Sequence, residues 1–305
     1  MTPSNTEAGQ RYRSADHSDQ SIQASASALV IGGTGTTGSR VVAQLRAEGA
    51  AYRLATRSPS ADDSAHVAFD WFAPETHLPA LAGVDRVYLI APVGVANPIP
   101  VLEPFLHAAR EAGVRRVVLL SSSAVTEDTP VLGQAHRLVR ELLPEWAILR
   151  PSWFMQNFID AGHPIAEGLR TRGEIVTAAG TGRVPFVDAA DIAAVAVRSL
   201  LDVDPPNVER VITGPEALSY DQAVAIIAEV TGRPVAHRSV EDDAFVAHLV
   251  ANGIPAEFAA VLGRLDQGIR QGSEDRTTSV VVEVTGRQPG SFREFVTANR
   301  AAFPG

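Results

Sequence analysis

Residues 28–38 read Ala-Leu-Val-Ile-Gly-Gly-Thr-Gly-Thr-Thr-Gly, four apolar residues followed at once by a glycine-rich turn. The apolar run predicts a short buried strand. After the turn, Val41, Val42 and Leu45 recur at helical spacing up to Gly49, and glycine is a common residue at the end of a helix. A strand, a glycine-rich turn and a helix in this order are typical of a dinucleotide-binding element.

Three glycines of the turn have separate predicted roles. Gly32 permits the tight turn, Gly35 lets a pyrophosphate approach the backbone, and Gly38 lets the helix pack close to the strand. The helix N-terminus supplies N–H donors and a positive dipole for the phosphates. The cofactor contacts predicted on this turn are Gly32, Thr34, Gly35, Thr36, Thr37 and Gly38.

The residue after the second predicted strand, 52–56, selects the cofactor. An NAD enzyme favours an acidic residue there for the ribose hydroxyls, whereas this chain has Thr56-Arg57-Ser58. The charge and forked donors of Arg57 suit a 2′-phosphate, which predicts NADP(H). A solvated surface arginine is the alternative reading of Arg57.

Further strands alternate with helices along the first half of the chain. Apolar runs predict strands at 67–71, 86–91, 116–121 and 146–150, with helices from Pro100 to Gly113 and over 133–143. This alternation predicts an α/β fold, a Rossmann-like doubly wound parallel sheet with a smaller C-terminal substrate-binding portion. The predicted units are a disordered tail over 1–26, an NADP(H)-binding domain over 27–152 and a mainly substrate-binding portion over 153–305, from which 184–213 returns to the sheet.

The second half has weaker signals. Short strands are expected at 174–178, 184–187 and 208–213, with a helix over 189–201. Ser219 with Gln222, and Ser291 with Glu294, each have the spacing of a capping box at the start of a helix.

Composition narrows the function classes. The net charge of -9 argues against nucleic acid as a partner, and no apolar run is long enough to cross a membrane. The chain contains no cysteine, and its eight histidines lack metal-ligand spacing, so we expect no metal. Residues 1–26 lack the features of a signal peptide, so a cytoplasmic location is expected. Whether the chain is a monomer or a dimer stays open.

All 26 basic residues are arginine. A Tyr-x-x-x-Lys pair, in which lysine lowers the pKa of a catalytic tyrosine, is therefore impossible. The nicotinamide is expected to face the region of 133–136, where His136 is the titratable candidate; a helix-packing histidine is the alternative. Ser121, Ser122 and Ser123 follow the fifth predicted strand, and we expect Ser121 to contact the cofactor and Ser122 and Ser123 to serve in catalysis, although serine is also common in turns.

The chain resembles the NmrA-like, atypical short-chain dehydrogenase/reductases, and among them the ergot-alkaloid biosynthesis reductases of the agroclavine dehydrogenase and festuclavine synthase type. The resemblance covers about residues 28–299. It rests on GGTGTTG at 32, FDW at 69, YLIAP at 88, VLLSSS at 118, GQAH at 133, LRPSWFMQNF at 149, GRVPFVDAADIAAVA at 182, GPEALSYD at 214, GRPVAH at 232 and VTGRQPGSFREF at 284.

The resemblance implies reduction of a cyclic iminium ion by NADPH, a reaction that gives a neutral amine without a proton donor. An aromatic pocket suits such a cation, and the candidates are Trp153, Phe154, Phe158 and Phe186, each of which could instead be core. The resemblance also places Asn157 beside the nicotinamide, with a turn or cap residue as the alternative. Ala91 and Pro92 end the strand predicted at 86–91, so we expect them to border the cofactor, although a proline that ends a strand needs no ligand to explain it.

The leading hypothesis is an NADPH-dependent reductase of an imine, iminium or conjugated C=C/C=O group in a bulky, apolar or cationic secondary metabolite. A non-catalytic NADP(H)-sensing regulator and a non-redox cyclase or isomerase are the alternatives.

Overall fold

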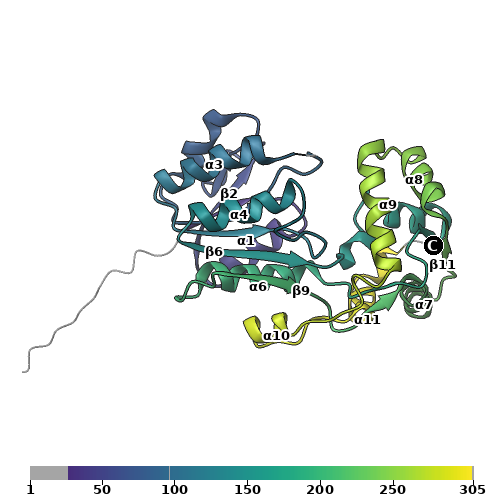
Figure 1. Cartoon of the computed structure of the whole chain (residues 1–305). Helices are drawn as coiled ribbons and strands as arrows, with labels where there is room; N and C mark the ends of the chain where they lie inside the picture. Colours follow the sequence, from purple (N-terminus) through teal and green to yellow (C-terminus); the bar gives the residue numbers. More distant parts are fainter. Residues whose placement is uncertain (1–26, 96, 304–305) are drawn as a thin grey trace, which may run out of the picture.

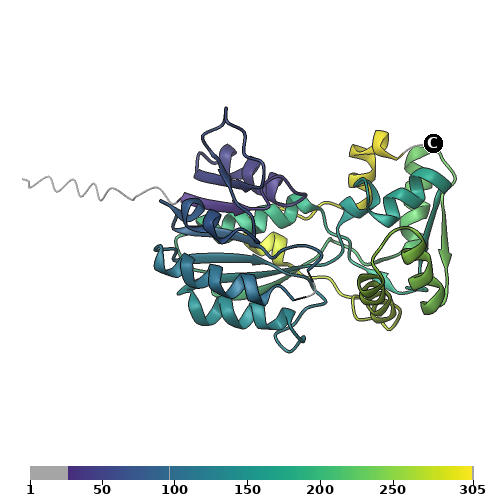
Figure 2. The same cartoon turned by 90° about the horizontal axis from the view of Figure 1, so that it is seen from above.

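The computed structural model describes residues 27–95 and 97–303, so the tail predicted over 1–26 lies outside the described residues. Two portions lie side by side, a larger one built on a seven-stranded sheet and a smaller one rich in helices (Figures 1 and 2). Most of the larger portion comes from the first half of the chain. Helices α7, α8, α9 and α11 lie in the smaller portion (Figure 1).

The sheet of the larger portion has the strand order β3-β2-β1-β4-β5-β6-β9, and every neighbouring pair is parallel. The predicted Rossmann-like doubly wound sheet is thereby confirmed. Its strands are β1 (Ser27–Ile31), β2 (Ala51–Thr56), β3 (His66–Ala68), β4 (Arg86–Ile90), β5 (Arg116–Leu120), β6 (Glu145–Pro151) and β9 (Val208–Ile212).

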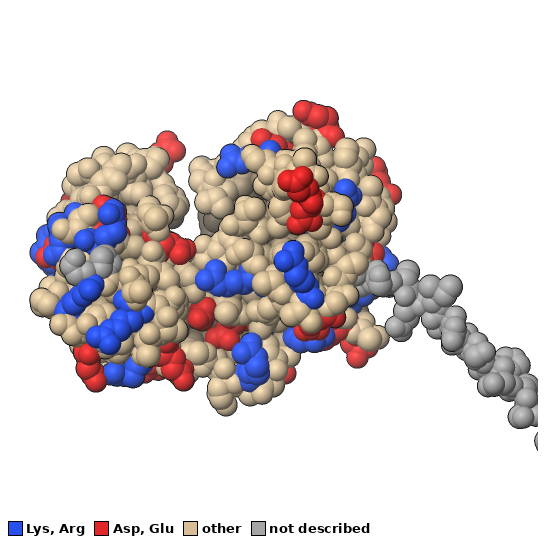
Figure 3. Space-filling view, turned by 180° about the vertical axis from the view of Figure 1, so that it is seen from behind, with Lys and Arg blue, Asp and Glu red and all other residues tan. Residues whose placement is uncertain are grey.

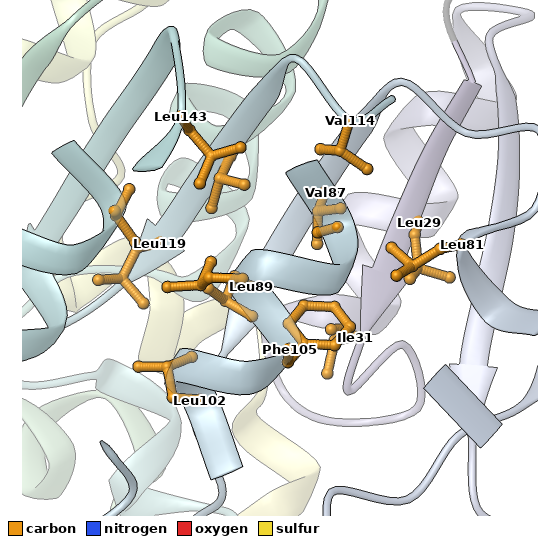
Figure 4. Close-up of a cluster of buried hydrophobic side chains, with 14 of the residues drawn as sticks. Leu29, Ile31, Leu81, Val87, Leu89, Leu102, Phe105, Val114, Leu119 and Leu143 are labelled. Carbon is orange, nitrogen blue, oxygen red and sulfur yellow. The ribbon is translucent and has the colours of Figure 1, made fainter. Parts of the chain in front are cut away.

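Helices cover both faces of this sheet. One face packs against α1 (Gly38–Ala47), α6 (Ala189–Leu201) and α10 (Val280–Thr285). The opposite face packs against α2 (His77–Leu81), α3 (Ile99–Glu111) and α4 (Leu132–Leu142). Figure 4 shows the second core, where Leu29, Ile31, Val87, Leu89 and Leu119 from the strands meet residues such as Leu81, Leu102 and Phe105 from the helices. Apolar strands that are covered on both faces are expected in a parallel sheet.

The smaller portion has its own apolar core, with Ile175, Phe186, Tyr220 and Phe292 among its members. Its elements are η2 (Met155–Phe158), α5 (Pro164–Arg172), β7 (Glu174–Thr177), β8 (Arg183–Val184), β10 (Leu218–Ser219), α7 (Tyr220–Thr231), β11 (Ala236–Ser239), α8 (Asp242–Ala251), α9 (Ala256–Arg270) and α11 (Phe292–Ala298). Short 3-10 turns, η1 (Pro74–Thr76) and η3 (Arg300–Ala302), complete the described elements.

The chain passes between the two portions more often than the sequence suggested. Of residues 184–213, α6 and β9 lie on the large sheet, but β8 pairs with β10 in the smaller portion. The strand predicted at 184–187 is therefore wrong beyond Val184, and Val187 forms only an isolated bridge with Phe154. Helix α10, which the sequence did not reveal, also returns to the large sheet, where Val281 joins the core against α6.

The two capping boxes predicted from the sequence are present at the starts of α7 and α11. The hydroxyl of Ser219 accepts the backbone N–H of Gln222, and Ser291 and Glu294 form the same reciprocal box at α11. Within the described part of the chain, the helices are all too short or too polar to pass through a bilayer.

Candidate functional site

A cavity of about 600 Å³ opens at the carboxyl ends of the central strands, where the sheet reverses its strand order between β1 and β4. In open parallel sheets, ligands bind at this reversal point. The volume lies in the range of small-molecule and cofactor sites. A notch separates the two portions in the space-filling view, and basic and acidic side chains are interspersed on the face shown (Figure 3).

The glycine turn forms one wall of the cavity, and its geometry explains the glycines. Gly32 has a positive φ of 71°, a backbone conformation that residues with a side chain rarely adopt. A Cβ on Gly38 would lie 2.1 Å from the carbonyl oxygen of Gly32, so only glycine lets α1 start so close to the strand. Gly33 is also constrained, because its Cβ would lie 2.5 Å from Leu54. Gly35 is exposed, so its backbone is open to an approaching pyrophosphate.

Most of the predicted cofactor contacts lie on this cavity. Gly32, Thr34, Gly35, Thr36 and Thr37 line it from the turn. Gly38 does not line it and lies buried beneath the turn. The hydroxyl of Thr37 accepts a hydrogen bond of 3.0 Å from Tyr88, which is fully buried on β4, so the turn is tied to the neighbouring strand.

Arg57 lines the outer end of the cavity and is exposed. It follows β2 directly and has Thr56 and Ser58 beside it on the same wall. Phe69 and Trp71 form the adjoining apolar wall, with ring centroids 5.1 Å apart in an edge-to-face arrangement. The cavity thus offers a cation and hydroxyls at one end and a flat apolar wall next to them, which fits an adenosine with a 2′-phosphate.

The inner end of the cavity is formed by residues that follow the middle strands. Ala91 and Pro92, predicted beside the cofactor, both line it, together with Ile90, Leu120 and Phe154. Ser121 and Asn157 are half-buried and lie outside the lining set. The residues present therefore fit an extended dinucleotide that runs from Arg57 across the glycine turn toward the end of β5.

One contact that the sequence did not suggest joins the two portions at the turn. The hydroxyl of Thr36 donates a hydrogen bond of 2.9 Å to the carboxylate of Asp160, which follows η2. Thr36 and Asp160 are 124 residues apart in the chain, so no local pattern could have paired them.

Ser121 and His136 form a hydrogen bond beside the inner end of the cavity. The Ser121 Oγ and His136 Nε2 atoms are 2.8 Å apart. On the other side of the ring, Nδ1 lies 3.4 Å from the Glu209 carboxylate, which also pairs with Arg150 at 3.2 Å. His136 is completely buried, so its side chain cannot touch a substrate directly, as its predicted catalytic role would require.

Burial lowers the pKa of His136, and Arg150 lowers it further, while the Glu209 carboxylate opposes both effects. Glu209 is not among the site residues predicted from the sequence. A signal was present, because Glu209 is a charged residue in the middle of the predicted strand at 208–213.

The other two serines have different surroundings. The hydroxyl of Ser123 is buried and donates a hydrogen bond of 2.9 Å to the Glu274 carboxylate. The Ser122 hydroxyl accepts a hydrogen bond from the backbone of Ala124, as turn serines often do. Burial raises the pKa of Glu274, and Ser123 partly offsets this. These contacts give Ser122 and Ser123 structural partners, whereas their predicted role was catalytic.

The predicted aromatic pocket is largely core. Phe158 and Phe186 are each 2% exposed and pack edge to face inside the smaller portion, so they are not available to a substrate. Trp153 is half-buried and packs against the same core. Only Phe154 of the four lines the cavity. Phe158 lies on the 3-10 turn over residues 155–158, whose apolar side chains are buried, and Phe186 joins the same core from the segment after β8.

The fold and the turn define a dinucleotide type of site, and comparison with known proteins gives the family. Residues 25–296 match the model of the NmrA-like family, so the chain belongs to that family, as the sequence predicted. The chain is 44% identical over 274 residues to the uncharacterized oxidoreductase YesF of Bacillus subtilis, covering 90% of this chain and 95% of that one. It is 35% identical over 279 residues to festuclavine synthase II of Penicillium roqueforti, covering 87% and 96%.

Solved structures share the fold at low sequence identity. The NADPH-dependent quinone oxidoreductase QOR2 of Escherichia coli, solved with NADPH, matches with a TM-score of 0.77 at 21% identity, covering 90% of this chain and 99% of that one. The triphenylmethane reductase of a Citrobacter species, solved with NADP(H), matches with a TM-score of 0.74 at 22% identity over the same shares. Relatives named as an oxidoreductase, as dehydrogenases and as an azoreductase agree with the predicted enzyme class.

Proposed function

We propose that this protein is an NADPH-dependent reductase that transfers hydride to an imine, iminium or conjugated C=C/C=O group of a bulky, apolar or cationic small molecule. The observation that carries the proposal is the cavity at the strand-order reversal, which joins an exposed Arg57 to the glycine turn and to the ends of β4 and β5. When bound there, NADPH would supply a hydride to the acceptor.

The chain's own residues would hold and orient this cofactor. The backbone of the turn and the N-terminus of α1 would bind the pyrophosphate. Arg57, Thr56 and Ser58 would bind the 2′-phosphate, and Phe69 with Trp71 would cover the adenine side. Ala91, Pro92 and Phe154 would border the nicotinamide and exclude water from it.

The names of the chain's relatives are consistent with such a reaction. The relatives include festuclavine synthases, agroclavine dehydrogenases and an NAD(P)H azoreductase. The structural neighbours include reductases of quinones and triphenylmethane dyes. These names differ in the compound that they mention, so they leave the acceptor class of this chain to be tested.

The test is NADPH oxidation, followed by absorbance, with a panel of quinones, cyclic imines and iminium salts, and with NADH in parallel. We expect turnover of at least one acceptor, with NADPH preferred over NADH. Calorimetric titration with NADPH alone separates binding from turnover. Tight binding without turnover would contradict the reductase and favour the NADP(H) sensor, and product formed without net NADPH consumption would favour the cyclase or isomerase.

A further inference from the structure

Ser121 lies beside the inner end of the cavity and is hydrogen-bonded to the buried His136. It follows β5 directly, and its neighbour Leu120 lines the inner end of the cavity. Ser121 is half-buried, whereas its partner His136 is fully buried. Of this pair, Ser121 alone has exposed surface, and it lies next in the chain to a residue of the cavity wall.

The surroundings of His136 suit a ring that carries a proton for part of the reaction. Glu209 on β9 lies 3.4 Å from Nδ1, a distance at which a carboxylate stabilises an imidazolium by charge without an ideal hydrogen bond. The other charged groups that act on the ring are Arg150 on β6 and Glu127, which precedes α4. Arg150 binds the second oxygen of Glu209 and so holds that carboxylate in place.

We propose that Ser121 is a catalytic proton donor, which His136 reprotonates. The acceptor is therefore a neutral carbonyl compound such as a quinone rather than a permanently charged iminium cation. This inference rests on the proposed reductase function. A cation becomes neutral when it gains hydride, so it needs no proton. A quinone becomes an oxyanion, which requires one.

The proton balance follows from the two hydrogen-bonded atoms. As the acceptor carbon gains hydride, its C=O π bond breaks and the oxygen takes the proton of Ser121 Oγ. Ser121 Oγ takes the proton of His136 Nε2, and the ring is left neutral with its remaining proton on Nδ1, toward Glu209. After the product leaves, Nε2 regains a proton from water through Ser121. The immediate product is a hydroxy ketone, which becomes the hydroquinone when its new C–H proton is lost to water and its second carbonyl oxygen takes a proton from water. The net reaction consumes one quinone, one NADPH and one proton, and gives one hydroquinone and one NADP+.

Burial lowers the pKa of His136, so the imidazolium gives up its proton readily but forms in fewer molecules as pH rises. The direction in which kcat changes with pH tests the role of His136. Only the protonated ring can donate, so kcat for a quinone should fall as pH rises through the lowered pKa of His136. Reduction of a permanently cationic acceptor should lack this limb.

The experiment compares two acceptors on the same holoenzyme. The first is 1,4-naphthoquinone, which needs a proton, and the second is the N-methyl-3,4-dihydroisoquinolinium cation, which does not. We expect Ser121→Ala and His136→Gln each to lower kcat for the quinone by about 100-fold or more, while any activity on the cation changes by less than about threefold. In the variants, the residual quinone rate should lose its dependence on pH.

The chain offers a matched control in His237→Gln. His237 lies between Thr177, 2.8 Å from its Nε2, and Asp221, 3.0 Å from its Nδ1, and none of the three lines the cavity. This variant should keep the quinone rate. As a readout without cofactor, the Nε2 resonance of His136 in ¹⁵N NMR spectra should shift in Ser121→Ala.

Several outcomes would overturn the proposal. Wild-type protein that reduces the cation but no quinone would refute it and leave the reductase function standing. So would a quinone rate that survives in both Ser121→Ala and His136→Gln, or equal losses for both acceptors. If wild-type protein binds NADPH and reduces neither acceptor nor any other in the wider panel, the proposed function fails and this inference fails with it.

Discussion

Two regions of this molecule have the same side-chain pattern and very different surroundings. In the larger portion, Ser121, His136 and Glu209 stand in a row, with Oγ to Nε2 at 2.8 Å and Nδ1 to carboxylate at 3.4 Å. In the smaller portion, Thr177, His237 and Asp221 form a similar row, with 2.8 Å and 3.0 Å for the same two contacts. We call these rows the sheet-end row and the distal row.

The difference lies in what the hydroxyl and the carboxylate face. The hydroxyl of the sheet-end row follows the carboxyl end of a parallel strand beside the cavity, and its carboxylate is 25% exposed. The hydroxyl of the distal row is buried at Thr177, and its carboxylate, Asp221, is 65% exposed. A hydroxyl–imidazole–carboxylate pattern is therefore insufficient evidence for catalysis, and its position relative to the fold's ligand-binding edge decides the interpretation.

The largest expected contrast comes from neutralising the two carboxylates. Glu209→Gln removes the charge that stabilises the imidazolium of His136, so kcat for a quinone should fall by about 10- to 100-fold. Asp221→Asn makes the same change in the distal row and should leave kcat within about twofold. Steady-state rates at saturating NADPH measure both. Equal losses of kcat in the two variants would show that the sheet-end row has no special role in the reaction.

A second contrast concerns pH. We expect pH to change the reaction rate through the sheet-end row and the stability of the protein through Asp266, near the distal row. Asp266 accepts the backbone N–H of Ala178, next to Thr177, at 2.8 Å. Burial raises the pKa of Asp266 to about 7, although that hydrogen bond and Arg270 oppose the shift. The folded protein therefore holds a proton that the unfolded chain releases near its ordinary pKa of about 3.9.

Because the unfolded state binds fewer protons in this range, stability should fall as pH rises between these two values. We expect Asp266 to contribute a loss of about 2 kcal/mol in the free energy of unfolding from about pH 5 to about pH 7. Asp266→Asn should abolish this slope, as measured by urea denaturation at several pH values. An unchanged slope in the variant would assign the pH dependence to other groups.

A third contrast tests whether the arginine on the cavity wall, and not any exposed arginine of the larger portion, is coupled to the cofactor. Arg57→Ala should raise KM for NADPH by about tenfold, because one charge-assisted contact to a phosphate is lost, and should leave KM for NADH unchanged. Arg110→Ala is the control, since Arg110 is exposed on α3 and does not line the cavity. Similar losses for both nucleotides at Arg57 would contradict a 2′-phosphate contact.

The smallest effect is expected from the hydroxyl of the distal row. Thr177→Val removes a buried hydrogen bond to His237, which should cost about 1 kcal/mol of stability. The rate on any acceptor should not change. Thermal denaturation and initial rates on the same preparation check both statements, and a loss of rate in a fully folded variant would give the distal row a functional role.

The parts of the site that could be predicted are those encoded over short stretches. The glycine turn, the strands beside it and Arg57 follow from residues within about thirty positions, because one strand–turn–helix unit and the next strand form the whole binding wall. Both capping boxes were predicted for the same reason, since each involves residues three apart.

The rest depends on pairings between distant segments. His136 meets Glu209 only because β9 joins the sheet next to β6, and the order of parallel strands is not encoded locally. Phe158 and Phe186 have the composition of an aromatic pocket, but the packing of η2 against α11 turns them into core. Helices α8 and α9 were missed, although Phe245 and Leu249 on α8 have the i,i+4 spacing of a buried helical face.

The repeated passage of the chain between the two portions has a mechanical consequence. The chain leaves the large sheet after β6, returns for α6 and β9, leaves again for the segment from β10 to α9, returns for α10 and leaves once more for α11. A truncation after β6 would strip away α6 and α10 and expose the apolar face that they cover. Neither portion can therefore be excised as an independent folding unit, and a single proteolytic cut in one crossing segment would leave the two portions tethered by the others.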